Sequence, residues 1–237
     1  MTRQHIVFLT GAGVSAESGL STFRGKDGMW TNEEWVHLAS TDALYNETRK
    51  CLDFYNWRRK KLAEVEPNDA HRMIAELEKE HEVTVITQNV DNLHEQAGSH
   101  NVIHLHGELM KVCSSRDTEN PLCWKTLDAT NYVVEPGTKA ADGSLLRPYI
   151  VFFGESVPNF EAAAEVAMEA DIFIIIGTSL NVYPAAGLVQ YASHDTPIFL
   201  IDPNTVMAKG THNVTHIQMG ASEGMAVLME KLKALKD

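Results

Sequence analysis

The stretch IVFLTGAGVSA, residues 6–16, carries the strongest indication of the fold. Its apolar run, residues 6–9, predicts a buried strand, and Gly11, Gly13 and Ala16 follow at the G-x-G-x-x-G/A spacing. A strand that leads into this spacing is typical of a dinucleotide-binding loop, in which backbone N–H groups and a helix N-terminus face a pyrophosphate. The stretch therefore predicts the first strand and turn of a nucleotide-binding α/β domain.

Short apolar runs recur along the chain, with helical patterns between them. Continuous rather than alternating apolar runs are typical of a parallel sheet that is covered on both faces. The sequence therefore predicts a doubly wound, Rossmann-like parallel sheet. The expected strands are Ile6–Leu9, Val83–Ile86, Val102–Leu105, Ile150–Phe153, Ile172–Ile176, Ile198–Ile201 and Val214–Ile217.

Three helices are predicted from capping residues and periodicity. Asn68 can cap a helix that runs through Leu77. Pro184 begins a second helix through Val189, and residues 221–235 form an amphipathic last helix.

Two segments, residues 20–66 and 110–146, are longer than a minimal nucleotide-binding fold needs, which is typical of lids or small inserted modules. We expect one catalytic domain over residues 1–237. Its large part would comprise about residues 1–20, 67–109 and 147–237, and its small module about residues 21–66 and 110–146.

The charge balance argues against a nucleic-acid partner. The chain has 20 Lys and Arg against 32 Asp and Glu, a net charge of −12, whereas nucleic-acid-binding proteins are usually basic. No secretory signal and no apolar run of membrane-spanning length is present in the sequence. We expect a cytoplasmic protein that binds neither nucleic acid nor membrane. The oligomeric state stays open, and a monomer is compatible with the sequence.

Polar or glycine motifs follow five of the predicted strands. In an open parallel sheet, ligands bind beyond the carboxyl ends of the strands. Each motif alone has a structural explanation: Asn89 and Asp91 could cap a helix that starts near Asn92, and His106 could bond to nearby backbone. Together they predict a binding site at one edge of the sheet. The motifs are residues 11–13 (GAG), 87–91 (TQNVD), 106–108 (HGE), 154–155 (GE) and 177–179 (GTS).

The chain resembles the sirtuins, a family of NAD-dependent protein deacylases. The resemblance extends from about residue 4 to the last helix, and its motifs stand in family order. It implies that NAD is consumed as a co-substrate, that acyl-lysine proteins are the substrates, and that the products are deacylated lysine, nicotinamide and O-acyl-ADP-ribose. The motifs are residues 11–19 (GAGVSAESG), 23–25 (FRG), 87–91 (TQNVD), 106–108 (HGE), 153–155 (FGE) and 177–179 (GTS).

The resemblance also implies which residues meet NAD. The glycine loop would lie at the pyrophosphate, Phe23 and Arg24 would close over the nicotinamide half, and Asp202 would meet the adenosine ribose. Many sirtuins have Asn where this chain has Asp202. The cofactor-binding residues expected are Gly11, Ala12, Gly13, Ala16, Phe23, Arg24, Gln88, Asn89, Asp91, Gly177, Thr178, Ser179, Asp202 and Ala221.

Three catalytic residues are implied in the same way. Asn89 and Asp91 would hold the nicotinamide carboxamide, and His106 would act as a general base, because imidazole titrates near neutral pH. His104 lies two residues earlier and so on the same face of a strand. A His-x-His metal pair is geometrically possible there, but the sequence offers no third ligand, so we expect none.

The acyl-lysine would be held by two groups of residues. Phe153, Gly154, Glu155, Asn181 and Val182 match family segments that sandwich the substrate as an added strand.

Tyr55 and Arg58 share one face of a helix expected over residues 44–62. They resemble the signature of class III sirtuins, which remove acyl groups that end in a carboxylate. As an alternative, Arg58 could belong to a basic run at the helix C-terminus, and Tyr55 could be ordinary core.

The chain departs from the family in its cysteines. Most sirtuins bind a structural zinc with two Cys pairs, but this chain has only Cys113 and Cys123 in that region and a third cysteine, Cys51, elsewhere. Four thiolates are not available, so we predict no zinc and no disulfide framework. The small module would then pack through Trp124, Leu127, Tyr132 and Val133.

The favoured function is removal of succinyl or malonyl groups, with acetyl also allowed, from protein lysine. One alternative keeps the NAD site but makes the chain a protein ADP-ribosyltransferase or an NAD hydrolase. A further alternative is a non-catalytic NAD-sensing module, which the presence of His106, Asn89 and Asp91 argues against.

Overall fold

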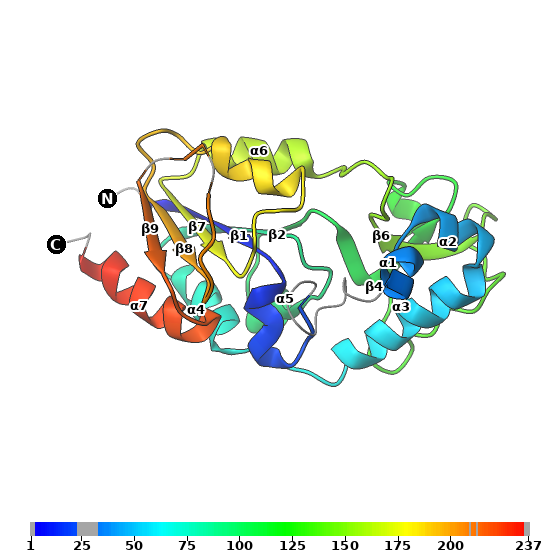
Figure 1. The fold of residues 1–237 in the computed structure, drawn as a ribbon. Helices are drawn as coiled ribbons and strands as arrows, with labels where there is room; N and C mark the ends of the chain where they lie inside the picture. Colours follow the sequence, from blue (N-terminus) through cyan, green and yellow to red (C-terminus); the bar gives the residue numbers. More distant parts are fainter. Residues whose placement is uncertain (1–2, 23–32, 209, 212, 235–237) are drawn as a thin grey trace.

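The computed structural model describes residues 3–22, 33–208, 210–211 and 213–234 (Figure 1). Six parallel strands form the main sheet, in the order β3-β2-β1-β7-β8-β9. The chain winds outward from the central β1 in both directions, which is the doubly wound arrangement, so the predicted fold class is confirmed. The strands are β1 (His5–Thr10), β2 (Glu82–Thr87), β3 (Val102–His104), β7 (Ile172–Ile176), β8 (Ile198–Ile201) and β9 (Val214–Ile217).

Alternate residues of β1 enter two different cores. Ile6 and Phe8 pack with helices α4 (Asp69–Leu77) and α7 (Ala221–Ala234), whereas Val7 and Leu9 pack with α6 (Phe160–Met168). Figure 1 shows α4 and α7 on one side of the sheet and α6 on the other. Both faces are covered, which explains why the strands are continuously apolar.

The helix signals in the sequence are mostly confirmed. Asn68 caps α4, because its Oδ1 accepts a hydrogen bond from Ala70 N at 3.0 Å. The last helix begins at Ala221 as expected. The segment after Pro184 is helical but is a 3-10 helix, Ala185–Gln190, and the segment after Gly11 is also a 3-10 helix, Ala12–Ser18.

The run Ile150–Phe153 is not a strand of the parallel sheet, and that prediction is wrong. Strand β6 (Leu146–Ile150) instead pairs antiparallel with β4 (Gly107–Ser114), which also pairs with β5 (Lys125–Thr126). The run is apolar because Ile150 and Phe152 enter a third core, shared with helix α3 (Thr48–Leu62). Two expected boundaries between the large part and the small module, at residues 109/110 and 146/147, fall inside β4 and β6. The division into these two parts stays a prediction.

The helix expected over residues 44–62 is interrupted. Helix α2 (Thr41–Asn46) ends before Glu47, whose φ of −128° and ψ of 40° are not helical, and α3 begins at Thr48. With α1 (Glu33–Leu38), these helices lie beside the small antiparallel sheet, at the opposite end of the molecule from β9 (Figure 1).

The predicted packing of the small module is partly right. Leu127 is buried against Val112 and Val134, and the Trp124 ring lies 5.1 Å from the Tyr149 ring between centroids. Val133, however, is 53% exposed, because its neighbour Val134 takes the inward position. Among the described helices, none combines the length and apolar character needed to cross a membrane.

Candidate active site

The candidate site lies where the strand order changes direction. Strands β1 and β7 are neighbours in the sheet but distant in sequence, and this switch point leaves a crevice outside their carboxyl ends. A cleft of about 1490 Å³ opens there and continues to the face of α3.

Close backbone packing shapes the floor of the cleft. Gly11 N donates to Ile176 O at 3.0 Å and Gly13 N donates to Gly177 O at 2.8 Å. The Gly13 N–H is therefore engaged within the protein, and the contact of the glycine loop with a pyrophosphate stays a prediction. A Cβ on Gly13 would lie 2.5 Å from the Gly177 Cα, so only glycine fits this crossing.

Nearly all of the predicted site residues that the structure describes line this one cleft. Residues from the glycine loop, the ends of β2, β7 and β8, the start of α7, and the turn after β3 all contribute. Phe23 and Arg24 lie outside the described residues. The lining includes Gly11, Ala12, Gly13, Ala16, Tyr55, Arg58, Gln88, Asn89, His106, Phe153, Gly154, Glu155, Gly177, Thr178, Ser179, Asn181, Val182, Asp202 and Ala221.

Asn89 presents one unused acceptor. Its Nδ2 donates to Ser15 Oγ at 3.1 Å, and its backbone N donates to Thr87 Oγ1 at 3.1 Å. Among the described residues, its buried Oδ1 has no hydrogen-bond partner. A buried amide oxygen without a partner carries a free-energy cost that a ligand donor can relieve, and a carboxamide N–H is such a donor.

Asp91 does not line the cleft, and its contact with nicotinamide stays a prediction. Its Oδ2 accepts from Ser15 Oγ at 3.1 Å, and its Oδ1 accepts from Leu93 N at 3.2 Å, at the start of α5 (Leu93–Ala97). Burial raises the pKa of Asp91, while the bonds from Leu93 and Ser15 lower it. Asp91 thus supports Ser15 and the beginning of α5 from behind the cleft wall.

His106 has the geometry of a general base. Its Nδ1 lies 2.9 Å from the Gln88 carbonyl oxygen, so Nδ1 carries the proton and donates to it. In the neutral ring, Nε2 then carries the lone pair. Burial lowers the pKa of His106, which favours this neutral form, and the bond to Gln88 opposes the effect.

The two arginines of α3 have different surroundings. Arg59 is fully buried, lies outside the cleft lining, and donates to Leu109 O at 2.8 Å and to Asn56 Oδ1 at 3.0 Å. Arg58 is half-buried and lines the cleft beside the buried Tyr55, whose ring centroid is 5.7 Å from the Arg58 Cζ. Burial lowers the pKa of Arg58, and the neighbouring Tyr55 and Asp91 oppose this shift.

Glu155 lines the cleft but is already engaged through its carboxylate. The buried Arg147 donates to it through both terminal nitrogens, at 2.6 and 2.9 Å, and Phe152 N donates to it at 2.9 Å. This pair fixes the turn that presents Phe153, which is 49% exposed.

The chain matches a known protein family over most of its length. The Sir2 family model matches residues 11–184. The chain belongs to the Sir2 family. This sirtuin is 52% identical over 229 residues to the NAD-dependent protein deacylase of Bacteroides thetaiotaomicron, with 97% of this chain and 98% of that protein covered. It is 47% identical over 230 residues to the NAD-dependent protein deacylase of Helicobacter pylori strain 26695, with 97% of each chain covered.

Solved structures agree with this assignment. A Sir2 homologue in complex with NAD superposes with a TM-score of 0.84 at 37% identity, covering 99% of this sirtuin and 91% of that chain. A Sir2 complex with a p53 peptide and NAD superposes with a TM-score of 0.76 at 29% identity, covering 98% and 95%.

NAD is the co-substrate of the sirtuins, and the residues of this chain fit it. The cleft spans the switch point, glycines shape its floor, and the Asn89 Oδ1 is a buried acceptor that has no partner within the described part of the chain. Among the described residues, no group of three or more His, Cys, Asp or Glu side chains could hold a metal ion. The absence of zinc stays a prediction.

Ser15 is the main site residue that sequence reasoning missed. It is 1% exposed and joins Asn89 to Asp91 by hydrogen bonds, yet it comes from a different strand end. The sequence did contain a signal for Ser15: it is a polar residue inside the glycine loop, two residues after Gly13, where the neighbouring Val14 and Ala16 are apolar.

Proposed function

We propose that this sirtuin is an NAD-dependent protein-lysine deacylase that prefers acyl groups ending in a carboxylate, such as succinyl and malonyl. The observation that carries the proposal is that Tyr55 and Arg58 line the same cleft as His106 and Asn89. A lysine side chain that enters the cleft to reach His106 would extend its acyl group toward α3.

Arg58 supplies the positive charge for such an acyl group. Its guanidinium is partly removed from water, and a carboxylate that takes up two of its N–H groups would offset this desolvation. Tyr55 is buried against Phe152, with ring centroids 5.3 Å apart, so its hydroxyl is held in place. Phenol and guanidinium together form a rigid pair of hydrogen-bond donors for a carboxylate at the end of the pocket.

The remaining roles follow from the geometry. NAD supplies the ribose carbon that receives the acyl oxygen. Asn89 would accept from the nicotinamide carboxamide through Oδ1, and His106 would take a proton at Nε2. The cleft-lining residues 153–155, together with Asn181 and Val182, would hold the peptide as an added strand.

The experiment measures NAD-dependent deacylation of one peptide carrying succinyl-, malonyl- or acetyl-lysine. We expect Arg58→Met to lower kcat/KM for the acidic groups by about ten- to a hundredfold, because a hydrogen bond to a charged group contributes about 1.5–3 kcal/mol. Activity on the acetyl peptide should stay within about threefold. A matched control is Arg49→Met, which removes a 68% exposed arginine from the same helix.

Two results would contradict the proposal. Faster removal of acetyl than of succinyl or malonyl, unchanged in Arg58→Met, would leave a simple deacetylase. Consumption of NAD without deacylated peptide would favour the alternative of an ADP-ribosyltransferase or NAD hydrolase.

A further inference from the structure

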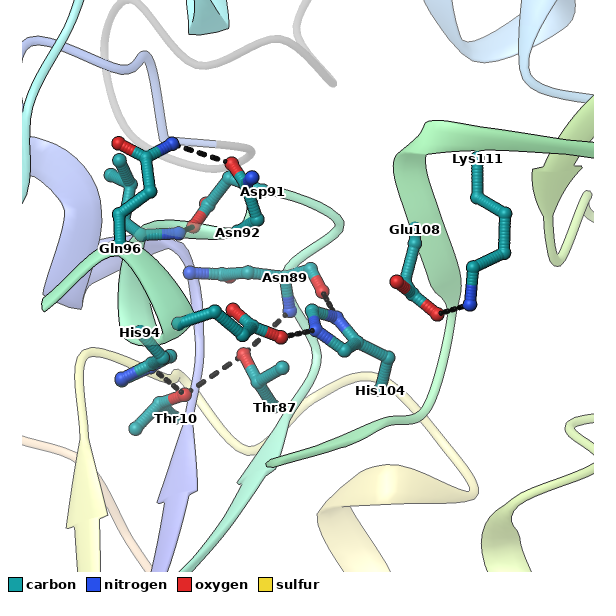
Figure 2. A network of polar contacts seen from close by, with 12 residues as sticks. Thr10, Thr87, Asn89, Asp91, Asn92, His94, Gln96, His104, Glu108 and Lys111 are labelled. Atoms are coloured by element: carbon teal, nitrogen blue, oxygen red, sulfur yellow. Dashed lines mark hydrogen bonds and ion pairs between the residues drawn. The ribbon is translucent and has the colours of Figure 1, made fainter. Parts of the chain in front are cut away.

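His104 lies at the end of β3, buried between two hydrogen-bond acceptors. Its Nδ1 is 3.1 Å from the carbonyl oxygen of Asn89, and its Nε2 is 2.7 Å from Oε1 of Glu95 on α5 (Figure 2). The side chain is 6% exposed. Asn159 Nδ2 donates to the His104 carbonyl at 2.8 Å, so the backbone of this residue is also held.

These two contacts define the charge of the ring. A neutral imidazole has one N–H, whereas a carbonyl oxygen and a carboxylate oxygen can only accept. Both contacts are hydrogen bonds at the same time only if both ring nitrogens are protonated. With an ionised Glu95 carboxylate, the two contacts are those of an imidazolium at position 104, in contrast to the neutral ring of His106.

The surrounding charges are consistent with an imidazolium. Burial lowers the pKa of His104, but the hydrogen bond and the charge of Glu95 outweigh it, so the pKa is raised above its ordinary value. His94 on the same helix is neutral, because burial places its pKa well below the ordinary range. The titratable groups that face His104 from its neighbouring elements or share its small cavity are Asp91, His94, Glu95, Glu108, Cys113, Glu119, Tyr149 and Glu155.

The hydrogen bond between His104 Nδ1 and the Asn89 carbonyl oxygen is one of three that hold Asn89 in place. Thr87 holds the backbone N of Asn89, Ser15 holds its Nδ2, and His104 holds its carbonyl oxygen. Within the part of the chain that the structure describes, the carboxamide Oδ1 has no partner and is the atom left for a ligand. His104 itself does not line the main cleft, so it can act on a ligand there only through Asn89.

We propose that His104, held as an imidazolium by Glu95, is a positioning residue that fixes the Asn89 peptide and so aims the Asn89 carboxamide oxygen at the nicotinamide end of the cleft. The proposal rests on the role proposed above for Asn89, but it does not depend on which acyl group is removed. As pH rises and His104 loses a proton, the ring must give up one of its two bonds. Nicotinamide binding is then expected to weaken as the pH rises. The loss of deacylation activity expected from protonation of His106 runs in the opposite direction, because it appears as the pH falls.

The first test reads the ring directly. Nitrogen-15 NMR of the histidine side chains, with His104 assigned by its loss in His104→Gln, should show two protonated ring nitrogens at pH 7. Glu95→Gln keeps an acceptor oxygen but removes the charge, and it should lower the midpoint of the His104 titration by about one pH unit. A wild-type ring with one unprotonated nitrogen at pH 7 would overturn the proposal.

The second test measures the effect of the His104 charge on inhibition by nicotinamide. In Glu95→Gln, the pH at which nicotinamide inhibition weakens should fall by about one unit, in step with the NMR midpoint. In His104→Gln, the inhibition constant should rise by about tenfold at pH 7, with little change in KM for the peptide, since misplacement of a binding group is costly. Glu78→Gln is the matched control, because Glu78 makes a His–Glu pair of 2.6 Å with the exposed His100 on the surface.

The two tests separate the possible failures. An imidazolium whose loss leaves nicotinamide inhibition unchanged would overturn the positioning role. If Asn89→Ala also leaves nicotinamide inhibition unchanged, then the role proposed for Asn89 fails together with it. Changes in Glu78→Gln as large as those in Glu95→Gln would attribute the effect to overall charge and would overturn the proposal as well.

Discussion

Gly13 and Gly177 join the two halves of the sheet by direct backbone contact: Gly13 N donates to Gly177 O at 2.8 Å, across the switch point between β1 and β7. Gly177 has a φ of 61°, a conformation that glycine adopts readily. The approach of these two residues sets the floor of the cleft, and side chains on either would separate the strand ends.

Gly13→Ala should therefore destabilise the protein and weaken NAD binding together. The added Cβ would lie 2.5 Å from the Gly177 Cα, and overpacking of this kind costs about 1–3 kcal/mol of unfolding free energy. Urea unfolding and NAD titration measure the two effects. Gly187→Ala serves as the control, since the nearest atom to its new Cβ is 4.0 Å away. A Gly13→Ala protein with wild-type stability would show that the loop adjusts.

The activity should have an acid limb set by His106. In the proposed role of His106 the neutral ring is the base, so kcat/KM should be full above the pKa of His106 and fall as the pH drops through it. Because burial lowers that pKa, the limb should lie below pH 6.5. His106→Ala should lose about a hundredfold or more of activity at every pH. His194→Ala, which removes an exposed histidine, should leave the profile unchanged, and an acid limb retained in His106→Ala would assign the limb to another group.

Arg147→Met should destabilise the turn that presents Phe153. Arg147 is 3% exposed and is bonded to Glu155 through both terminal nitrogens. Removing one partner of a buried pair leaves an uncompensated charge and costs about 3 kcal/mol or more. We expect the peptide KM to rise more than the Kd for NAD. In the control, Lys61→Met breaks the exposed pair with Glu64 and should change the unfolding free energy by less than about 1 kcal/mol.

Removal of metal should have no effect on this sirtuin. Burial raises the pKa of the Cys51 and Cys113 thiols to about 12, which disfavours the thiolate that zinc requires. We expect dialysis against a strong chelator to leave Tm and deacylation unchanged, and the purified protein to contain well under one zinc per chain. Stoichiometric zinc, or a Tm that falls with chelator and recovers with added zinc, would show that a structural site exists.

Local patterns in the sequence were sufficient for the nucleotide-binding framework. The apolar run of residues 6–9 and the glycines after it identified β1 and its turn, and Asn68 identified the start of α4. These signals are local, since a cap or a buried strand depends on residues a few positions apart. The motifs that contain Asn89 and His106 are local signals too, because each directly follows the apolar run of a strand.

Sequence patterns did not predict features that depend on contacts with residues far away in the chain. The run Ile150–Phe153 is as apolar as a strand of the main sheet, but the pairing of β6 with β4 and the contact of Phe152 with Tyr55 place it elsewhere. For Asp91, the bonds of its carboxylate to Ser15 and to the start of α5 were likewise not foreseen from the sequence.

Local sequence patterns alone predicted a parallel sheet wound around a glycine loop, with amide, imidazole and guanidinium groups at the edge of the cleft. Which of two neighbouring residues points into the cleft depends on the tertiary structure. Arg58 lines the cleft while Arg59 is buried beside it, and His106 lines the cleft and is held at Nδ1 while His104 is held at both nitrogens. The reason is physical: helix rotation and strand pairing are fixed by packing against residues far away in the chain, and these contacts determine whether a polar group meets a ligand or a buried partner.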